Sequence, residues 1–259
     1  MSAVLSALGP GIAVVLGGSQ GIGAAVVARL VAARRRTVVV ARTAEVLERS
    51  CREVDPTGEI AVPLVCDVTE PDAGSRIADA ATQSFGALPS AIVHCSSIFT
   101  PGTLFESSPD TVGEVFDTNV VAPFRVIRTL LDRRSAEAVP GPLSEPGAVV
   151  VINSTAGLQM NFDSSICSAS KIAVRALTDA LRREVNPQGV RVTSIFPGRT
   201  DTRMLQQVLD YERSEFDPDL ALAPEDVADA VMVALCSASS AEITELVIRP
   251  VRRAAAVTC

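Results

Sequence analysis

Short runs of β-branched and aliphatic residues alternate with helical patterns along this chain, and this alternation restricts its fold more than any other feature. Each run is continuously apolar, which is typical of parallel strands that are buried on both faces. Strands are predicted at Ile12–Leu16, Thr37–Ala41, Ile60–Val65, Ala91–His94, Val149–Ile152, Val190–Phe196 and Ile243–Ile248. Helices are predicted between them, at Gly21–Ala33, Thr43–Glu53, Pro71–Ser84, Val112–Arg134, Ser165–Val185 and Pro224–Cys236. This repetition predicts an α/β protein with a doubly wound parallel β-sheet of about seven strands flanked by helices.

Length and composition restrict what kind of molecule carries this sheet. The 259 residues fit a single domain, residues 1–259, better than two. The Pro- and Gly-rich stretch Pro140–Gly147 is predicted to be a surface loop. A formal net charge of −7 argues against binding to nucleic acid. No segment supplies the roughly 18 consecutive apolar residues of a membrane span, and Met1–Pro10 has no basic residue and is too short for a signal peptide, so we expect a cytoplasmic protein without membrane contact.

Six cysteines stand alone in the sequence, at positions 51, 66, 95, 167, 236 and 259. The closest two are 15 residues apart, so the chain has no CxxC pair and no spacing typical of metal ligands. We therefore predict reduced thiols, most of them small core residues, and no metal site.

A glycine-rich turn follows the first predicted strand and opens the first helix. It reads Gly17-Gly18-Ser19-Gln20-Gly21-Ile22-Gly23. Glycines allow a tight turn and a close approach of the backbone to a pyrophosphate, whose charge then lies at the N-terminus of the helix. Glycines also simply make loops, but in the first strand–helix–strand unit this turn predicts a nucleotide site and a Rossmann fold.

The end of the second predicted strand indicates which dinucleotide would bind. A site for NAD places Asp or Glu there to bind the ribose 2′-hydroxyl. Here the chain reads Val40-Ala41-Arg42-Thr43, without an acid before Glu45. Arg42 either meets the 2′-phosphate of NADP or is a solvated arginine at a strand end. After the third strand, Asp67, which Val68 follows, caps the next helix, faces the adenine amino group, or does both.

Lys171 is the only lysine among the 23 Lys and Arg residues of the chain. Arginine is a planar fork whose charge is not titrated. Lysine is a compact ammonium whose three donors can reach a ribose hydroxyl or lower the pKa of a neighbour. Lys171 lies 17 residues after Ser154 and four after Cys167, near the start of an amphipathic helix. This placement favours a chemical role over an accident of composition.

These residues resemble the short-chain dehydrogenase/reductase family of one-domain Rossmann proteins, and the resemblance covers essentially the whole chain. The glycine turn and Asp67 match the cofactor half of the family, and Pro197-Gly198 with Thr202 matches the turn that holds the nicotinamide end. With Arg42, the resemblance implies NADP(H) as the cofactor. The implied contacts are Gly17, Ser19, Gln20, Gly21, Ile22, Gly23, Arg42, Asp67, Val68, Asn119, Lys171, Pro197, Gly198, Thr200 and Thr202.

The resemblance also implies a catalytic centre. Asn119 matches the active-site asparagine of the family, Ser154 the catalytic serine and Lys171 the catalytic lysine. The catalytic tyrosine of the family lies four residues before the lysine and 13 after the serine, and Cys167 stands at that position.

Three roles are open for Cys167. A thiol has a reference pKa of about 8.5, and a neighbouring ammonium and a position early in a helix lower it. The thiol is therefore a candidate proton donor, acting directly or through a water or Ser154. A thiolate is alternatively a nucleophile. The third role is that of a small core residue left after catalysis was lost.

The chain departs from the family at one more place, after the fourth strand. Where the family has Asn-Asn-Ala-Gly after the fourth strand, this chain has His94-Cys95-Ser96-Ser97. His94, the only histidine, is predicted to be a packed or hydrogen-bonded residue at the strand end. Tyr211, the only tyrosine, falls in the expected substrate lid at about 199–223. It either reaches into the site when the lid closes or, as we favour, is an ordinary amphipathic lid residue.

The sequence thus predicts an NADP-dependent oxidoreductase that transfers hydride between NADP(H) and a small carbonyl or alcohol. Ser154 orients the substrate oxygen, Cys167 or a water relays the proton, Lys171 binds the nicotinamide ribose and tunes the proton donor, and Asn119 holds a relay water. A non-redox enzyme, such as an isomerase or dehydratase, and an inactive accessory subunit are the alternatives. The resemblance also implies a homodimer or homotetramer that packs through the helices before and after the fifth strand.

Overall fold

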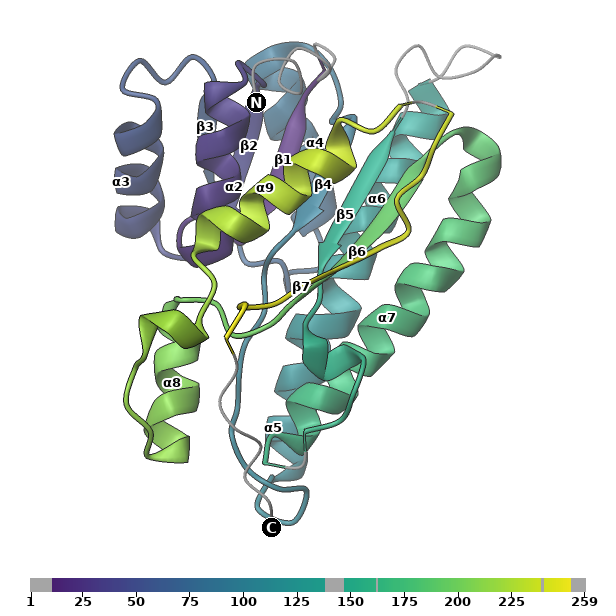
Figure 1. Ribbon diagram of the computed structural model, residues 1–259. Coiled ribbons are helices and arrows are strands. Elements are labelled where there is room, and N and C mark those ends of the chain that lie inside the picture. Colours follow the sequence, from purple (N-terminus) through teal and green to yellow (C-terminus); the bar gives the residue numbers. More distant parts are fainter. Residues whose placement is uncertain (1–10, 138–146, 162, 239, 253–259) are drawn as a thin grey trace.

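One sheet of seven parallel strands forms the centre of the computed structural model, which describes residues 11–137, 147–161, 163–238 and 240–252 (Figure 1). The strands are β1 Ala13–Leu16, β2 Thr37–Ala41, β3 Ala61–Val65, β4 Ala91–His94, β5 Ala148–Ile152, β6 Arg191–Pro197 and β7 Glu245–Ile248. Their order across the sheet is β3-β2-β1-β4-β5-β6-β7. The chain runs outward from β1 to β3, returns to β4 beside β1, and runs outward again to β7. The predicted doubly wound Rossmann fold is therefore confirmed.

Helices cover both faces of this sheet. Alternate residues of a strand point to opposite faces, so Ala13 and Val15 of β1 belong to one core cluster and Val14 and Leu16 to the other. The first cluster is completed by α2, α3 and α9, and the second by α4, α6 and α7. The helices are α2 Gly21–Ala32, α3 Ala44–Val54, α4 Ala73–Phe85, α5 Pro109–Phe116, α6 Ala122–Glu137, α7 Ser165–Val185, α8 Arg203–Glu212 and α9 Pro224–Leu235.

The helix predicted over Val112–Arg134 is interrupted. A π-helical turn, Asp117–Val121, separates α5 from α6, and the amide of Ala122 donates to a carbonyl five residues earlier. Pro123 explains the interruption, because proline has no amide hydrogen and its ring clashes with the carbonyl four residues before it. That carbonyl belongs to Asn119, so the irregular turn lies at a predicted site residue.

The expected lid is the segment between β6 and α9, and its two ends are hydrogen-bonded to each other. The amide of Leu222 donates to the carbonyl of Arg199 at 2.8 Å, and the amide of Asp201 donates to the carbonyl of Leu222 at 2.8 Å. The segment contains α8, which the sequence analysis did not predict, and Tyr211 lies on this helix with its side chain partly exposed. In Figure 1, α8 lies below the carboxyl ends of the strands, apart from the helices that cover the sheet.

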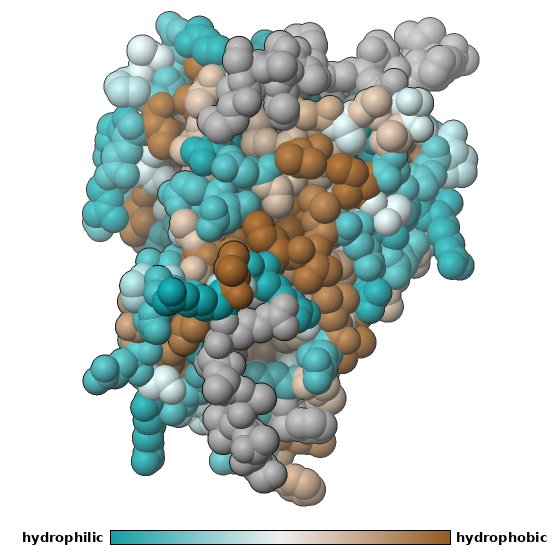
Figure 2. Space-filling model, in the orientation of Figure 1, coloured by the Kyte–Doolittle hydropathy of each residue, from teal (hydrophilic) through white to brown (hydrophobic). Residues whose placement is uncertain are grey.

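Several expectations concern other parts of the chain. The described residues contain no helix that is long and apolar enough to cross a membrane. The five cysteines in the described ranges are free, whereas Cys259, Met1–Pro10 and nearly all of the expected loop Pro140–Gly147 lie outside them. Apolar side chains gather over the middle of the face in Figure 2, where β7 forms the sheet edge, and Val247 of β7 is 52% exposed.

Candidate active site

The glycine turn lies at the carboxyl end of β1, in the middle of the sheet. Gly17 has a φ of +79°, and a Cβ at this position would lie 2.8 Å from the backbone of Ser96 in the loop after β4. A Cβ on Gly23 would lie 2.1 Å from the carbonyl oxygen of Gly17. The turn is therefore closed so tightly that these two positions accept only glycine.

The helix that this turn opens begins without a capping side chain. Gln20 stands at the N-cap of α2 without a side-chain hydrogen bond, and the first turn contains no acidic residue. The first amides of a helix have no partner within the helix and carry partial positive charge. Because these amides remain uncapped, the start of α2 suits a phosphate group.

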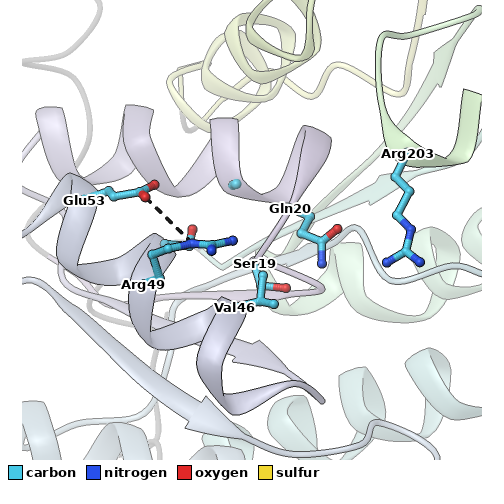
Figure 3. A pocket seen from close by; sticks show the side chains of 8 residues that line it. Ser19, Gln20, Val46, Arg49, Glu53 and Arg203 are labelled. Atoms are coloured by element: carbon cyan, nitrogen blue, oxygen red, sulfur yellow. Dashed lines mark ion pairs between the residues drawn. The ribbon is translucent and has the colours of Figure 1, made fainter. Parts of the chain in front are cut away.

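An open polar cavity of about 390 Å³ lies beside the glycine turn. Figure 3 shows Gln20 between Arg203, at the start of α8, and Arg49 of α3, which forms an ion pair with Glu53 at 3.9 Å. Ser19 also lines this cavity. The cavity brings the glycine turn together with the start of α8, but Arg42, Asp67 and Val68 do not line it.

Arg42 and Asp67 lie next to each other at the ends of β2 and β3. The Arg42 guanidinium is 3.8 Å from Oδ2 of Asp67, and its side chain is 62% exposed. Oδ1 of Asp67 accepts from the amide and the hydroxyl of Thr69 at 2.9 and 2.8 Å. The helix-cap alternative for Asp67 is wrong, because α4 begins after Asp72 and Asp67 instead turns the chain after β3.

The turn after β6 packs against the glycine turn. The amide of Gly198, which follows Pro197, donates to the carbonyl of Ile248 at 2.8 Å. The Thr202 hydroxyl caps α8 and donates to the carbonyl of Thr200 at 3.2 Å. A Cβ on Gly21 would lie 3.0 Å from Cγ2 of Thr202, so the two turns are in contact.

Asn119 binds the loop after β4. Its Oδ1 accepts from the amide of Ile98 at 2.8 Å and the hydroxyl of Ser97 at 3.1 Å. Its Nδ2 donates to the carbonyl of Ile98 at 3.0 Å and to Oγ of Ser170 at 3.2 Å. Both amide hydrogens are thus used within the protein, so a relay water at Nδ2 would have to displace one of these partners.

The turn that carries Ser154 follows β5 and is tied to the backbone of Lys171 in α7. Oγ of Ser154 accepts from the amide of Ala156 at 3.1 Å, and the Ser154 hydroxyl hydrogen has no acceptor among the described residues. Nδ2 of Asn153 donates to the backbone carbonyl of Lys171 at 3.1 Å, which ties the residue before Ser154 to α7. Within the described ranges the Lys171 ammonium forms no hydrogen bond or ion pair. Burial lowers the pKa of Lys171 to about 8, although the thiols of Cys167 and Cys95 oppose this shift.

Cys167 is buried under the loop after β4 rather than open to a substrate. Its Sγ accepts from the amide of Thr100 at 3.1 Å and donates to the carbonyl of the same residue at 3.2 Å. The side chain is 7% exposed and lies in a small apolar cluster with Val115 and Ile166. Burial raises the pKa of the thiol, and the Thr100 amide and the Lys171 charge offset this only in part. The expectation of a lowered thiol pKa is therefore wrong, because it considered the ammonium and not the burial.

His94 is buried at the end of β4, with 1% of its surface exposed. Its Nδ1 lies 3.4 Å from the hydroxyl of Ser96. Burial, with a smaller contribution from the Lys171 charge, lowers the pKa of His94 from 6.5 to about 3. The ring is therefore neutral at physiological pH.

We expect His94 to make the fold sensitive to acid. Between about pH 6.5 and pH 3 the unfolded chain binds a proton at His94 that the folded protein excludes, so stability falls as the pH falls through this range. At 1.36 kcal/mol per pKa unit, this residue alone should lower the free energy of unfolding by about 2 kcal/mol between pH 7 and pH 5. Urea unfolding at both pH values should show a smaller difference for His94→Gln than for the parent. Equal differences in the two proteins would contradict the assignment.

The site contains supporting residues that no sequence pattern pointed to directly. Ser170 holds Asn119, Asn153 holds the Lys171 turn, and Thr100 holds Cys167. Ser170 and Asn153 could have been found from the sequence, because they are polar and directly precede Lys171 and Ser154. Thr100 was not, because it acts through its backbone and no side-chain pattern marks it.

The sheet order and the closed glycine turn at the end of β1 are those of a Rossmann fold. Residues 11–213 match the model of the short chain dehydrogenases, and the chain belongs to this family, as the sequence predicted. It is 28% identical over 241 residues to an uncharacterized oxidoreductase of Staphylococcus aureus (strain MW2), with 93% of this chain and 97% of that protein covered. It is 32% identical over 244 residues to the glycine betaine reductase of Emericella nidulans, with 92% of this chain but 18% of that protein covered.

Solved structures with the same fold include proteins crystallised with nicotinamide cofactors. One is a variant of actinorhodin polyketide ketoreductase with NADPH, with a TM-score of 0.80 and 24% identity over 93% of this chain and 96% of that one. Another is the alcohol dehydrogenase of Thermococcus sibiricus with 5-hydroxy-NADP, with a TM-score of 0.80 and 22% identity over 95% and 99% of the two chains. At these identities the similarity establishes the fold.

Proposed function

We propose that this protein is an NADP-dependent oxidoreductase that transfers hydride between NADP(H) and a small carbonyl or alcohol. The observation that carries the proposal is the closed glycine turn at the uncapped start of α2, next to a β2 end that carries Arg42 and no acid. Family membership and the NADP-bound proteins of the same fold support the same conclusion.

The residues present fit such a dinucleotide. The uncapped amides of α2 would bind the pyrophosphate, Arg42 the 2′-phosphate, and Gly198 and Thr202 the nicotinamide end. Lys171 would bind the nicotinamide ribose. When bound, the nicotinamide gives or takes the hydride.

The remaining chemistry falls to the Ser154, Cys167 and Lys171 centre. The unused hydroxyl hydrogen of Ser154 is available to orient a substrate oxygen. Asn119 fixes the loop after β4 that forms one wall of this centre. A proton for the product oxygen has to come from a group that stands beside Ser154 and is protonated at neutral pH.

Cofactor choice is tested at Arg42. The parent is expected to bind NADP more tightly than NAD, and Arg42→Ala is expected to lower NADP affinity about tenfold or more, because a charge-assisted hydrogen bond contributes about 1.5–3 kcal/mol. NAD affinity should not change. Calorimetric titration of both cofactors measures this. Arg128→Ala, which removes an exposed arginine of α6 that pairs with Asp132, is the matched control. Equal NADP and NAD affinities in the parent would refute the proposed preference.

Turnover separates the oxidoreductase from the other predicted classes. Oxidation of NADPH with a panel of aldehydes and ketones, and reduction of NADP with the matching alcohols, is the expected result. Tight NADP binding without turnover on the whole panel would instead favour a non-redox enzyme or an accessory subunit.

We also propose that the chain forms a homodimer or homotetramer through α6 and α7. Val121, just before α6, and Ile172 and Leu177 of α7 are exposed, and exposed apolar side chains on neighbouring elements are typical of an interface. The exposed β7 edge offers a second surface of the kind that a tetramer needs. Sedimentation equilibrium should show a dimer or tetramer, and the double variant Ile172→Glu, Leu177→Glu should shift it toward the monomer. A monomeric parent would exclude this assembly.

A further inference from the structure

We infer that the Lys171 ammonium, and not the Cys167 thiol, delivers the proton to the substrate oxygen, and that Cys167 is a positioning residue that holds the loop after β4 against α7. This inference rests on the proposed function and identifies the proton donor of its centre.

The thiol hydrogen of Cys167 is already committed. It points to the carbonyl of Thr100 at 3.2 Å, while the sulfur accepts from the amide of Thr100 at 3.1 Å. The same loop is tied to the start of α7 by the amide of Gly102, which donates to Asp163 at 2.9 Å, and by the amide of Ser165, which donates to Gly102 at 3.2 Å. The contact between Cys167 and Thr100 is thus one of three adjacent hydrogen-bonded contacts between the loop after β4 and the start of α7.

The Lys171 ammonium is not committed in this way. It has no hydrogen-bond acceptor and no carboxylate partner within the described residues, and the ionisable groups on which its charge acts are the thiols of Cys167 and Cys95 and the ring of His94. Residues four apart lie on the same face of a helix, about 6 Å apart along its axis. Helical side chains also lean toward the N-terminus. Lys171 is therefore expected to extend toward Cys167, in line with the electrostatic interaction between the two groups, whereas the short side chain of Cys167 is hydrogen-bonded to the loop.

The groups around Lys171 leave its proton free to move. From β4, His94 is neutral, and burial raises the pKa of Cys95 to about 12, so its thiol is neutral too. Residues 148–157, which form β5 and the turn after it, contain no ionisable side chain. Other elements that pack against α7 carry ionisable residues that form no ion pair with Lys171: Asp110, Glu114, Asp117 and Arg191.

The proposed step balances as follows. The carbonyl carbon gains a hydride from the reduced nicotinamide, and its double bond to oxygen becomes a single bond. An N–H bond of Lys171 breaks, and its proton goes to that oxygen, directly or through the Ser154 hydroxyl. The neutral amine left on Lys171 then takes a proton from solvent.

The lone lysine makes the proton donor directly observable. Biosynthetic incorporation of lysine that is ¹³C-labelled at Cε gives a single signal in this chain. Its chemical shift, followed against pH in the protein without cofactor, should titrate with a midpoint of about 8, in line with the lowered pKa of Lys171. The Cys167→Ala variant should titrate at this midpoint or slightly below it, because the thiol that it removes opposes the shift. A midpoint above about 10, the ordinary lysine pKa, would overturn the inference whether or not the enzyme is active.

Kinetics of the complete protein with NADPH supply the second measurement. Carbonyl reduction should fall as the pH rises through the Lys171 midpoint, and Cys167→Ala should keep that profile. Lys171→Arg keeps the charge but cannot release a proton at these pH values, so turnover should fall by about 10²–10⁴-fold. An active Lys171→Arg variant, or a profile that is lost in Cys167→Ala, would overturn the inference. Absence of NADPH oxidation by the parent would instead refute the proposed function, and the assignment of the donor with it.

Hydrogen exchange tests the positioning role of Cys167. In Cys167→Ala the Thr100 amide loses its acceptor, so it should exchange faster than in the parent. Cys167→Ser should restore its protection, because a hydroxyl makes both hydrogen bonds. Unchanged Thr100 exchange in Cys167→Ala would overturn this role, and the melting temperature of each variant verifies that it is folded.

Discussion

Gly23→Ala is expected to open the glycine turn and weaken NADP binding at least tenfold. The added Cβ would lie 2.1 Å from the carbonyl oxygen of Gly17 and 3.1 Å from Cα of Gly18. Both contacts are backbone, so no side chain can move away and the turn itself must shift. Overpacking of this kind costs about 1–3 kcal/mol, and a comparable loss of binding energy is about tenfold or more in affinity. Calorimetric titration with NADP and urea unfolding measure the two effects.

Gly113→Ala is the matched control for this variant. Gly113 lies within α5, and a Cβ there would meet no atom within 4 Å. In a helix the change from glycine to alanine stabilises by about 0.5–1 kcal/mol, so this variant should gain stability and bind NADP like the parent. A Gly23→Ala variant that binds NADP as tightly as Gly113→Ala would refute the assignment of the turn to the pyrophosphate.

Cys167→Tyr is expected to destabilise the protein rather than restore the catalytic group of the family. The site is packed around a small side chain, with Ile98, Phe99 and Val112 against the cluster that contains Cys167. A ring at this position overpacks the cluster, at about 1–3 kcal/mol, and removes two hydrogen bonds to Thr100, each contributing about 0.5–1.5 kcal/mol. The free energy of unfolding should therefore fall by roughly 2–6 kcal/mol.

Cys167→Ser separates the two causes, because it keeps the size and the hydrogen bonds but removes the sulfur. Its free energy of unfolding, measured in urea, should be close to that of the parent, whereas that of Cys167→Tyr should be well below it. A tyrosine variant that is as stable as the parent, and that reduces carbonyls faster in a single turnover, would show that the family's pocket is intact and that the loop after β4 gives way easily.

The sheet was predictable because burial on both faces leaves a strong signal in each strand. Every strand except β7 begins and ends within one residue of its predicted range, and β7 begins two residues later than expected. The continuous apolar runs arise because neighbouring residues, such as Val14 and Val15, face two different cores. The interruption at Asn119 was less visible, although Pro123 inside the predicted helix was its signal.

The chemistry of Cys167 was not predictable in the same way. Its position followed from spacing to Ser154 and Lys171, but its hydrogen-bond partner lies 67 residues earlier and contributes only backbone atoms. Whether the pKa of the thiol is raised or lowered depends on how completely the loop after β4 buries it. The spacing of residues in the sequence does not show how deeply a side chain is buried. The same holds for Lys171, whose lowered pKa comes from burial that only the folded chain creates.

The two ends of the segment between Arg199 and Leu222 are hydrogen-bonded to each other, so much of the segment between them can be replaced. Because two backbone hydrogen bonds join its ends, the path of the chain from β6 into α9 does not depend on what lies between them. The cost of closing such a loop grows only slowly with its length, by about 0.6 kcal/mol for each doubling. Segments of different length and composition can therefore be grafted between Thr202, which contacts the glycine turn at Gly21, and Leu222 while the sheet and that turn stay in place. If this segment is the substrate lid that the sequence predicts, changes in substrate preference can be confined to it while the rest of the molecule stays the same.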